Sequence, residues 1–299
     1  MKPADVSPLL KRTWTEFQAD KAMTLGAALA FYTALSVAPL LLLVTVIAGV
    51  AFGEQATRGE IAQQLNDLIG AEGAKAVEAM LASTRSPGGN LLSTVVGIVT
   101  LLLGATGVFT SLQDALDTVW NVKPDEAHSG LWRMIRDRLA SFSMICAMAF
   151  LLLVSLVFSA VLNAVGGVVD RWVPFGELWM GAANLVLGFL VTTLMFATIY
   201  KYLPHARPAW SDVGVGALIT ACLFTLGKYL IGLYLGKASI GSTYGAAGSF
   251  VVLLVWIYYS SLIVLFGAEF TQVYAQTHGS GLTPAGRRRL AGQPDPVPA

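Results

Sequence analysis

The stretch VGVGALITACLFTLGKYLIGLYL, residues 213–235, is apolar or small at almost every position and carries one charge, Lys228. A run of about 20 such residues crosses the ~30 Å hydrocarbon core of a bilayer as a helix. Five further runs share this character: 26–52, 91–112, 139–165, 179–203 and 246–268. None of them alternates with the two-residue period of a membrane strand. The sequence therefore predicts an all-α, polytopic membrane protein with six transmembrane helices.

The composition of the whole chain supports this class. Of the 299 residues, 55% are hydrophobic and 12% are charged, whereas a soluble domain carries about 25% charged residues. The first run is longer than the apolar core of a signal peptide, and a polar or amphipathic segment precedes it, so we expect it to remain in the protein. Cys146 and Cys222 both fall inside apolar runs, which predicts buried thiols rather than a disulfide.

Lysine and arginine are distributed unevenly between the loops. Of the 19 such residues, 13 lie in the N-terminal segment, the second and fourth loops and the C-terminal tail, and 5 lie in the other loops. Cytoplasmic loops carry the excess of positive charge in membrane proteins. Both termini are therefore predicted to be cytoplasmic.

The chain divides into three parts. Residues 1–25 predict an amphipathic helix on the inner membrane surface, with Leu9, Leu10, Trp14 and Phe17 as its apolar side. Residues 26–275 are expected to form the membrane domain. Its outer loop, residues 53–90, is predicted to be an amphipathic helical hairpin. We expect this hairpin to cap the helix bundle, and the alternative is that it acts as a gate. Residues 276–299 are rich in Pro, Gly and Arg and predict a disordered cytoplasmic tail.

Small and polar residues form a stripe on each of two predicted helices. On the second helix the stripe places Gly97, Gly104, Gly107 and, at its inner end, Asp114 on one face. On the fifth helix it runs through Gly214, Lys228 and Gly232. Small residues let helix backbones approach closely in lipid, so we predict that these glycines pack helices.

Lys228 is the main candidate for a functional residue. Its helical position puts it ~24 Å from the inner end of the helix, where a lysine costs up to about 2.5–3.5 kcal/mol. The possible partners of Lys228 are Asp170, Glu177, the face of Trp256 and a bound anion. The alternative is that the lysine has no functional role and its side chain extends toward the outer membrane surface. Structural pairing and ligand contact both remain open at this stage.

The sixth helix adds aromatic and acidic candidates. Trp256, Tyr258 and Tyr259 fall near mid-membrane, where their polar atoms need hydrogen-bond partners. Glu269 lies near the cytoplasmic end, on the order of 20 Å along the membrane axis from Lys228, which is too far for an ion pair. We expect Glu269 to meet Lys21, Lys201 or Arg138, and to organise an inner gate together with Asp114.

Three stretches together resemble a known family: ADKAMTLGAALAFYTALSVAPLLLL (19–43), YKYLPHARPAWSDVGVGALITACLFTLGKYLIGLYL (200–235) and STYGAAGSFVVLLVWIYYSSLIVLFGAEFTQVY (242–274). The chain is similar over most of its length to the YihY/BrkB family, formerly labelled ribonuclease BN-like. The resemblance implies a six-helix integral protein of the bacterial inner membrane. Transporter and virulence labels come with the family.

The residues argue against the ribonuclease label. RNA hydrolysis requires clustered metal ligands or a general acid–base pair, together with a basic surface. The histidines at positions 128, 205 and 278 lie in separate segments, none with a metal-ligand neighbour at helical spacing. We therefore predict no enzyme activity, no catalytic residues, no metal, no cofactor and no nucleic-acid partner.

Two function classes remain. The first is transport or flipping of a lipid or other amphiphilic anion, with Lys228 holding the anionic group and Tyr258, Tyr259 and Trp256 lining its site. The second is a non-catalytic scaffold of the cell envelope, in which the polar stripes only pack helices. Membrane lipids are the expected partners in either case.

Overall fold

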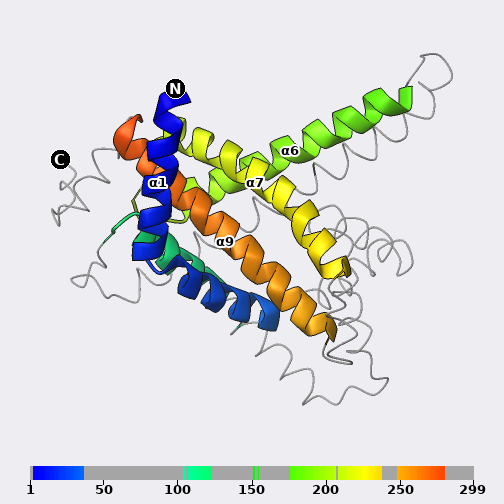
Figure 1. Cartoon of the computed structure of the whole chain (residues 1–299), viewed down its shortest axis with the longest axis horizontal. Helices are drawn as coiled ribbons and strands as arrows, with labels where there is room; N and C mark the ends of the chain where they lie inside the picture. Colours follow the sequence, from blue (N-terminus) through cyan, green and yellow to red (C-terminus); the bar gives the residue numbers. More distant parts are fainter. Residues whose placement is uncertain are drawn as a thin grey trace, which may run out of the picture. The chain divides into compact units, whose positions relative to one another are not determined.

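The computed structural model describes residues 3–36, 104, 107–122, 151, 154, 176–206, 208–237 and 248–279. Within these residues the regular structure is helical, without a strand, as the all-α prediction requires. The helices are α1 (Pro3–Ala19), Ala22–Ser36, 107–119, α6 (Gly176–Tyr202), α7 (Trp210–Lys237) and α9 (Gly248–Thr277) (Figure 1).

Three of these helices are long and apolar enough to cross a membrane: Gly181–Tyr202, Trp210–Tyr234 and Phe250–Thr277. They correspond to the predicted runs 179–203, 213–235 and 246–268. Helix Ala22–Ser36 covers the beginning of the first run, and 107–119 begins inside the second. The run 139–165, the outer loop 53–90 and the tail after residue 279 lie outside the described residues or nearly so.

Helix α9 extends nine residues beyond the predicted end of its apolar run, to Thr277. The additional residues keep apolar side chains at helical spacing, and two of them, Phe270 and Val273, are buried against Leu9 of α1. Packing of an apolar face stabilises a helix more than local propensity does. Glu269 therefore lies inside a helix rather than at its end.

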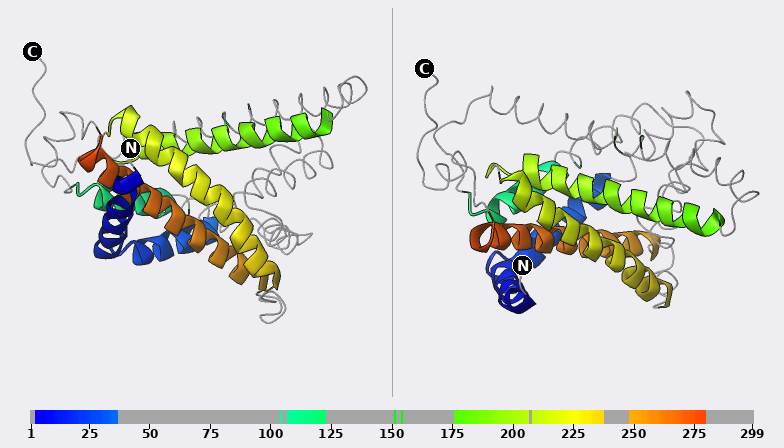
Figure 2. Two further views of the ribbon diagram at one scale, coloured as in Figure 1. Left: turned by 45° about the horizontal axis from the view of Figure 1, so that its top comes forward. Right: turned by 90° about the horizontal axis from the view of Figure 1, so that it is seen from above.

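The chain forms two compact units, each built from segments that are distant in the sequence. The first unit combines Met1–Phe17 with Leu116–Leu223 and Phe266–Ala299, and the second combines Gln18–Ala115 with Phe224–Leu265. Helices α7 and α9 contribute to both units and run side by side in each view of Figures 1 and 2.

In the first unit, α1 packs across the last turns of α9. Leu9 contacts Phe270 and Val273, and the ring of Phe17 meets that of Phe266 edge-on at 5.8 Å between centroids. The four residues of the predicted apolar side of α1 differ in burial. Leu9 and Phe17 are buried, whereas Leu10 and Trp14 are 43% and 47% exposed, because α9 covers only part of the apolar surface.

A reciprocal contact joins α7 and α9 in the first unit. A Cβ atom added to Gly216 would overlap Thr271, and one added to Gly267 would overlap Thr220 and lie 2.6 Å from the Tyr200 hydroxyl. Each threonine follows its own helix's glycine by four residues and donates its hydroxyl hydrogen bond to that glycine's carbonyl oxygen, at 2.8 Å and 2.6 Å. Glycine on one helix therefore accommodates threonine on the other, in both directions.

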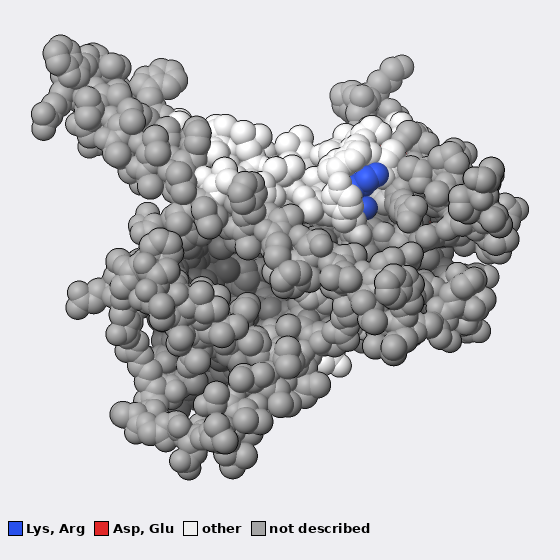
Figure 3. Space-filling model, turned by 180° about the vertical axis from the view of Figure 1, so that it is seen from behind, with Lys and Arg blue, Asp and Glu red and all other residues white. Residues whose placement is uncertain are grey.

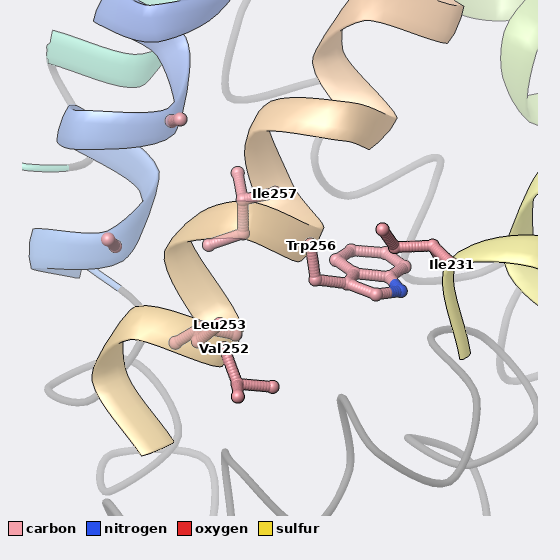
Figure 4. Packing of buried hydrophobic residues seen from close by; sticks show 7 residues of the cluster. Ile231, Val252, Leu253, Trp256 and Ile257 are labelled. Atoms are coloured by element: carbon pink, nitrogen blue, oxygen red, sulfur yellow. The ribbon is translucent and has the colours of Figure 1, made fainter. Parts of the chain in front are cut away.

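The second unit has an apolar core between α7, α9 and helix Ala22–Ser36. Figure 4 shows Trp256 of α9 directed toward Ile231 of α7, with Ile257 and Leu253 on the adjoining part of α9. The core is completed by Ala30 and Ala34 of helix Ala22–Ser36 and by Val252 of α9. Small residues on Ala22–Ser36 are what allow α9 to approach this helix closely.

The predicted packing glycines fall into two groups. A Cβ atom at Gly104 would lie 2.7 Å from the Ser36 Cβ, and one at Gly107 would overlap the Tyr32 ring, so both lie at a close helix contact. At Gly214 and Gly232 a Cβ atom would meet nothing within 4 Å among the described residues. Gly216 and Gly227 are the close-packed glycines of α7, because its buried face is rotated from the predicted stripe. Gly97 lies outside the described residues.

The surface of the long helices is largely apolar. Large side chains of α6 and α7 are more than half exposed, among them Leu185, Leu190, Leu226 and Leu233. On the face drawn in Figure 3, the described surface is uncharged apart from a small basic patch. Cys222, predicted to be buried, is also exposed on α7. This surface is suited to contact with lipid acyl chains rather than with water.

Candidate functional site

Lys228 lies in the second unit at the border between two surfaces of α7. Its side chain is half-buried, and its Nζ lies 5.6 Å from the ring centroid of Tyr229. Gly227 on one side is buried against α9, whereas Tyr229 and Leu230 on the other are more than half exposed. The ammonium group therefore lies between the packed helix interface and the exposed apolar surface.

Tyr259 packs against Gly227, the residue before Lys228 on α7. A Cβ atom on Gly227 would lie 3.0 Å from the Tyr259 hydroxyl and 2.6 Å from Ile263 Cδ1. Glycine at position 227 thus leaves room for the tyrosine hydroxyl beside the backbone that carries Lys228. The phenol is a donor and an acceptor of hydrogen bonds within one residue of the lysine.

Tyr258 is directed to another part of the second unit. Its ring approaches Gly26 of helix Ala22–Ser36, with 3.6 Å between Cε2 and a Cβ added there. Successive residues of a helix are about 100° apart, so the two tyrosines leave α9 in different directions. Tyr258 packs toward Gly26, whereas Tyr259 packs toward Gly227 beside Lys228.

Trp256 belongs to the apolar core of the second unit. Its ring meets that of Phe224 edge-on at 6.2 Å, and the side chain is 8% exposed. The indole Nε1 is buried and has no hydrogen-bond partner among the described residues. The sequence identified Trp256 as a candidate that needs a partner at mid-membrane, and this unused donor lies at the α7–α9 interface.

The second-unit parts of α7 and α9 contain hydrogen-bond donors but no carboxylate. Between Val213 and Ala268 neither helix has an aspartate or a glutamate. The polar groups there include the Lys228 ammonium, the Tyr259 hydroxyl and the Trp256 indole N–H. Such a set is suited to an anion and unsuited to a cation.

The first unit contains a contact that the sequence analysis did not predict. Asp117 Oδ2 lies 2.6 Å from His205 Nδ1, and Asp117 Oδ1 accepts a 2.8 Å hydrogen bond from the backbone N–H of His205. Both side chains are partly buried. We call this contact the Asp117–His205 clamp; it fixes the segment between α6 and α7 to the end of helix 107–119.

The helix that carries Asp117 ends in a way that positions its carboxylate. Asn121 adopts a left-handed conformation, with φ of 52°, and the N–H of Val122 donates to the Asp117 carbonyl at 2.9 Å. Together with the bond from Asn121 N–H to Thr118 O, this is a Schellman ending, in which asparagine tolerates the positive φ.

The two residues predicted to form an inner gate differ in environment. Asp114, in the second unit, is exposed, whereas Glu269, in the first unit, is fully buried. Lys201, one predicted partner of Glu269, donates to the Pro208 carbonyl at 2.6 Å and lies over the Trp210 ring. Arg138 and Asp170 lie outside the described residues, as does the side chain of Glu177.

Comparison with known proteins gives the family. A family model described as "Virulence factor BrkB" matches residues 13–290. The chain belongs to the BrkB family. This agrees with the resemblance seen in the three sequence stretches, and it makes the chain a membrane protein. No solved structure matches.

Curated relatives carry the name UPF0761 membrane protein. The protein from Psychromonas ingrahamii is 35% identical over 151 residues, which are 49% of this chain and 51% of that protein. One from Stenotrophomonas maltophilia is 28% identical over 88% of this chain and 59% of its own length. One from Mannheimia succiniciproducens is 26% identical over 87% of each. The match thus spans little more than half the length of the first two relatives, and none of these names states an activity.

Proposed function

We propose that this BrkB-family protein binds an amphiphilic anion, a lipid or a lipid-like molecule, and moves it across the bacterial inner membrane. Lys228 holds the anionic group, and Tyr259 donates a hydrogen bond to it. The uneven distribution of lysine and arginine supports an orientation with both termini in the cytoplasm.

The observation that carries this proposal is the position of Lys228. A lipid that approaches along the exposed side chains of Leu226, Leu230 and Leu233 brings its headgroup to the ammonium group at the edge of the packed interface. A charged side chain within a membrane helix is costly, and it is retained where it binds or conducts something.

The other predicted residues take more limited roles in this proposal. Trp256 offers its unused indole N–H at the interface beside the site, and Tyr258 supports α9 against helix Ala22–Ser36. Asp114 and Glu269 lie toward the proposed cytoplasmic ends of their helices, each in its own unit.

Native mass spectrometry of the protein purified from its own membrane tests the proposal. We expect an anionic lipid to remain bound to the wild type and to be lost from Lys228→Ala. Removing a hydrogen bond to a charged group weakens binding by about 1.5–3 kcal/mol, or roughly 10- to 150-fold. Lys201→Ala is the matched control, because it also removes one lysine but leaves Lys228 in place.

A second measurement separates a transporter from a scaffold. In vesicles that contain a fluorescent anionic lipid, the wild type should exchange the lipid between leaflets and Lys228→Ala should not. A lipid profile unchanged by Lys228→Ala, together with no exchange by the wild type, would reject transport and favour the scaffold. Labelling of Lys228→Cys by a water-soluble thiol reagent, in a background without Cys146 and Cys222, reports whether water reaches the site.

A further inference from the structure

One end of the first unit contains the ends of three helices of membrane length. Helix α6 ends at Tyr202 and α7 begins at Trp210, and the centroids of these two rings lie 5.9 Å apart. The end of α9 lies there too, because a Cβ atom added to Gly279 would overlap the carboxylate of Asp212 on α7. A membrane that these helices cross therefore has one of its surfaces at this end of the unit.

Helix α1 lies across this end and is held there by part of its apolar side (Figure 1). Leu9 and Phe17 are buried against α9, and Arg12 Nη2 donates a 2.6 Å hydrogen bond to Gln276 Oε1. These contacts set the depth of α1 along α9 and its rotation about its own axis. The side chains that α9 leaves uncovered are thereby fixed at the level of the helix ends.

The uncovered side of α1 combines apolar groups with a positive charge. Leu10 and Trp14 are exposed and lie four residues apart, so they are neighbours on one side of the helix. The Trp14 ring stacks on the Phe17 ring, with 5.6 Å between centroids and 15° between planes, which fixes its direction. Lys11, also exposed, lies beside them. We call Leu10, Lys11 and Trp14 the α1 anchor.

The chemistry of the α1 anchor matches the headgroup region of a bilayer. Water would leave a leucine and an indole ring without apolar contacts, whereas the hydrocarbon core would remove water from the Lys11 ammonium. The headgroup region accommodates both, because an indole places its apolar ring toward the acyl chains and its N–H toward the polar groups. Lysine is attracted to the phosphates of anionic lipids.

The corner between α6 and α7 repeats the same combination on a different element. Tyr202 and Trp210 are 65% and 50% exposed. The Nζ of Lys201 donates to the Pro208 carbonyl at 2.6 Å and lies 5.6 Å from the centroid of the Trp210 ring. Exposed tyrosine and tryptophan at the ends of membrane helices are typical of the membrane–water interface. This corner gives a second marker of the membrane surface, independent of α1.

We propose that the α1 anchor binds the phospholipid headgroup region at the level of Tyr202 and Trp210. The Leu10 side chain and the Trp14 ring contact the upper part of the acyl chains, and Lys11 contacts a lipid phosphate. Because α1 is packed on α9, this contact holds the last turns of α9 at a fixed depth in the membrane. The lipids bound here are part of the surrounding bilayer and are not the transported molecule.

Depth-dependent fluorescence quenching of the full-length protein tests the proposal. The protein is placed in vesicles of phosphatidylcholine and phosphatidylglycerol that contain lipids brominated at one depth of the acyl chain. The signal of Trp14 is the difference between the wild type and Trp14→Phe, which keeps a ring against Phe17. We expect bromine near the headgroup to cause a larger loss of this signal than bromine near the chain end or acrylamide in the water. Trp210, measured with Trp210→Phe, should give the same order.

Trp120 is the matched control, because it belongs to the same unit and is 2% exposed. Its signal, measured with Trp120→Phe, should be lost with none of the three quenchers. Three results for Trp14 would overturn the proposal. The largest loss with acrylamide would place α1 in water, and the largest loss with deep bromine would place it in the hydrocarbon core. No loss with any quencher would mean that protein, such as a second copy of this chain, covers the α1 anchor.

The charge of Lys11 is tested by lipid composition. Lys11→Glu should reduce the loss of Trp14 signal from shallow bromine more in vesicles with phosphatidylglycerol than in phosphatidylcholine alone. An equal reduction in both, or none, would contradict the contact between Lys11 and a lipid phosphate.

Spin labels on α1 give a readout that keeps every tryptophan. Leu10→Cys and Thr15→Cys, in a background without Cys146 and Cys222, place the label on two exposed sides of α1, about 140° apart. The label at position 10 should be more accessible to oxygen than to a water-soluble nickel chelate, and the label at position 15 should show the reverse. Equal preference at both positions would overturn the proposal.

This inference does not rest on an anion bound at Lys228. Quenching of Trp14 reports contact with lipid whether or not a lipid is transported. Loss of lipid binding in Lys228→Ala with unchanged quenching of Trp14, or the converse, would separate the two proposals.

Discussion

The two units of this protein bury different kinds of side chain. In the first unit, Asp212, Glu269 and Gln272 are buried together with threonines at positions 13, 220 and 271. In the second unit, Ser36 is the polar residue among the described buried ones, and the core consists of Ala, Val, Leu, Ile and Trp. Burial of polar groups costs free energy unless they are hydrogen-bonded. The difference indicates that the second unit is organised by packing and the first by polar contacts as well.

The largest loss of stability is expected from a substitution in the apolar core of the second unit. Trp256→Ala removes the ring that packs between α9 and Ile231, and such truncations cost about 3–5 kcal/mol. Trp256→Phe, which keeps an aromatic ring against Phe224, should cost clearly less. Thermal unfolding in detergent measures both variants. A smaller loss for Trp256→Ala than for Trp256→Phe would contradict a core organised by packing.

The Asp117–His205 clamp tests the polar organisation of the first unit. Asp117→Ala removes two hydrogen bonds to one carboxylate, and bonds to a charged group contribute about 1.5–3 kcal/mol. Asp114→Ala, on the same helix but exposed, should change stability by less than about 0.5 kcal/mol. The same unfolding assay compares the pair. Equal effects would mean that the clamp does not hold the α6–α7 segment.

The reciprocal contact between α7 and α9 predicts opposite results for two glycines of one helix. Gly216→Ala forces a Cβ atom into Thr271, and overpacking costs about 1–3 kcal/mol. Gly214→Ala meets nothing within 4 Å among the described residues and should gain up to about 1 kcal/mol from helix propensity. A melting temperature below that of the wild type for Gly216→Ala, and above it for Gly214→Ala, would support the contact. A stabilised Gly216→Ala would disprove it.

The smallest expected effect concerns a single hydrogen bond. Tyr200→Phe leaves the ring in place and removes the 3.1 Å contact between its hydroxyl and Thr220 Oγ1. A typical hydrogen bond contributes about 0.5–1.5 kcal/mol to the free energy of unfolding. Tyr202→Phe, which changes an exposed ring, should leave this free energy almost unchanged. A double-mutant cycle with Thr220→Val isolates the pairwise contribution. No coupling energy would make this polar contact a consequence of packing alone.

The sequence was sufficient to predict the three long helices. Apolar runs of membrane length have few alternatives, so α6, α7 and α9 lie where the runs predict them. The end of α9 was missed because it depends on Leu9, which is about 260 positions away in the sequence. Hydropathy along one segment contains no information about such a partner.

The rotation of α7 was also beyond sequence reasoning. Its small residues are so frequent that Gly214 and Gly216 both begin plausible stripes, and contact with Thr271 decides between them. One signal was present and unused: the sequence Gly-Ala-x-x-Thr occurs at both 216–220 and 267–271. The Asp117–His205 clamp joins residues 88 positions apart, and no local pattern marks it.

The reciprocal glycine–threonine contact has a consequence for how the sequence can vary. The side chains at positions 216 and 271 occupy one space at the helix contact, and those at positions 220 and 267 occupy another. A larger side chain at one position of a pair therefore requires a smaller one at the other position of the same pair. Substitutions at these positions should therefore occur together in homologous sequences, as Gly/Thr in one order or the other. Gly216→Thr combined with Thr271→Gly should restore the stability that either change alone removes.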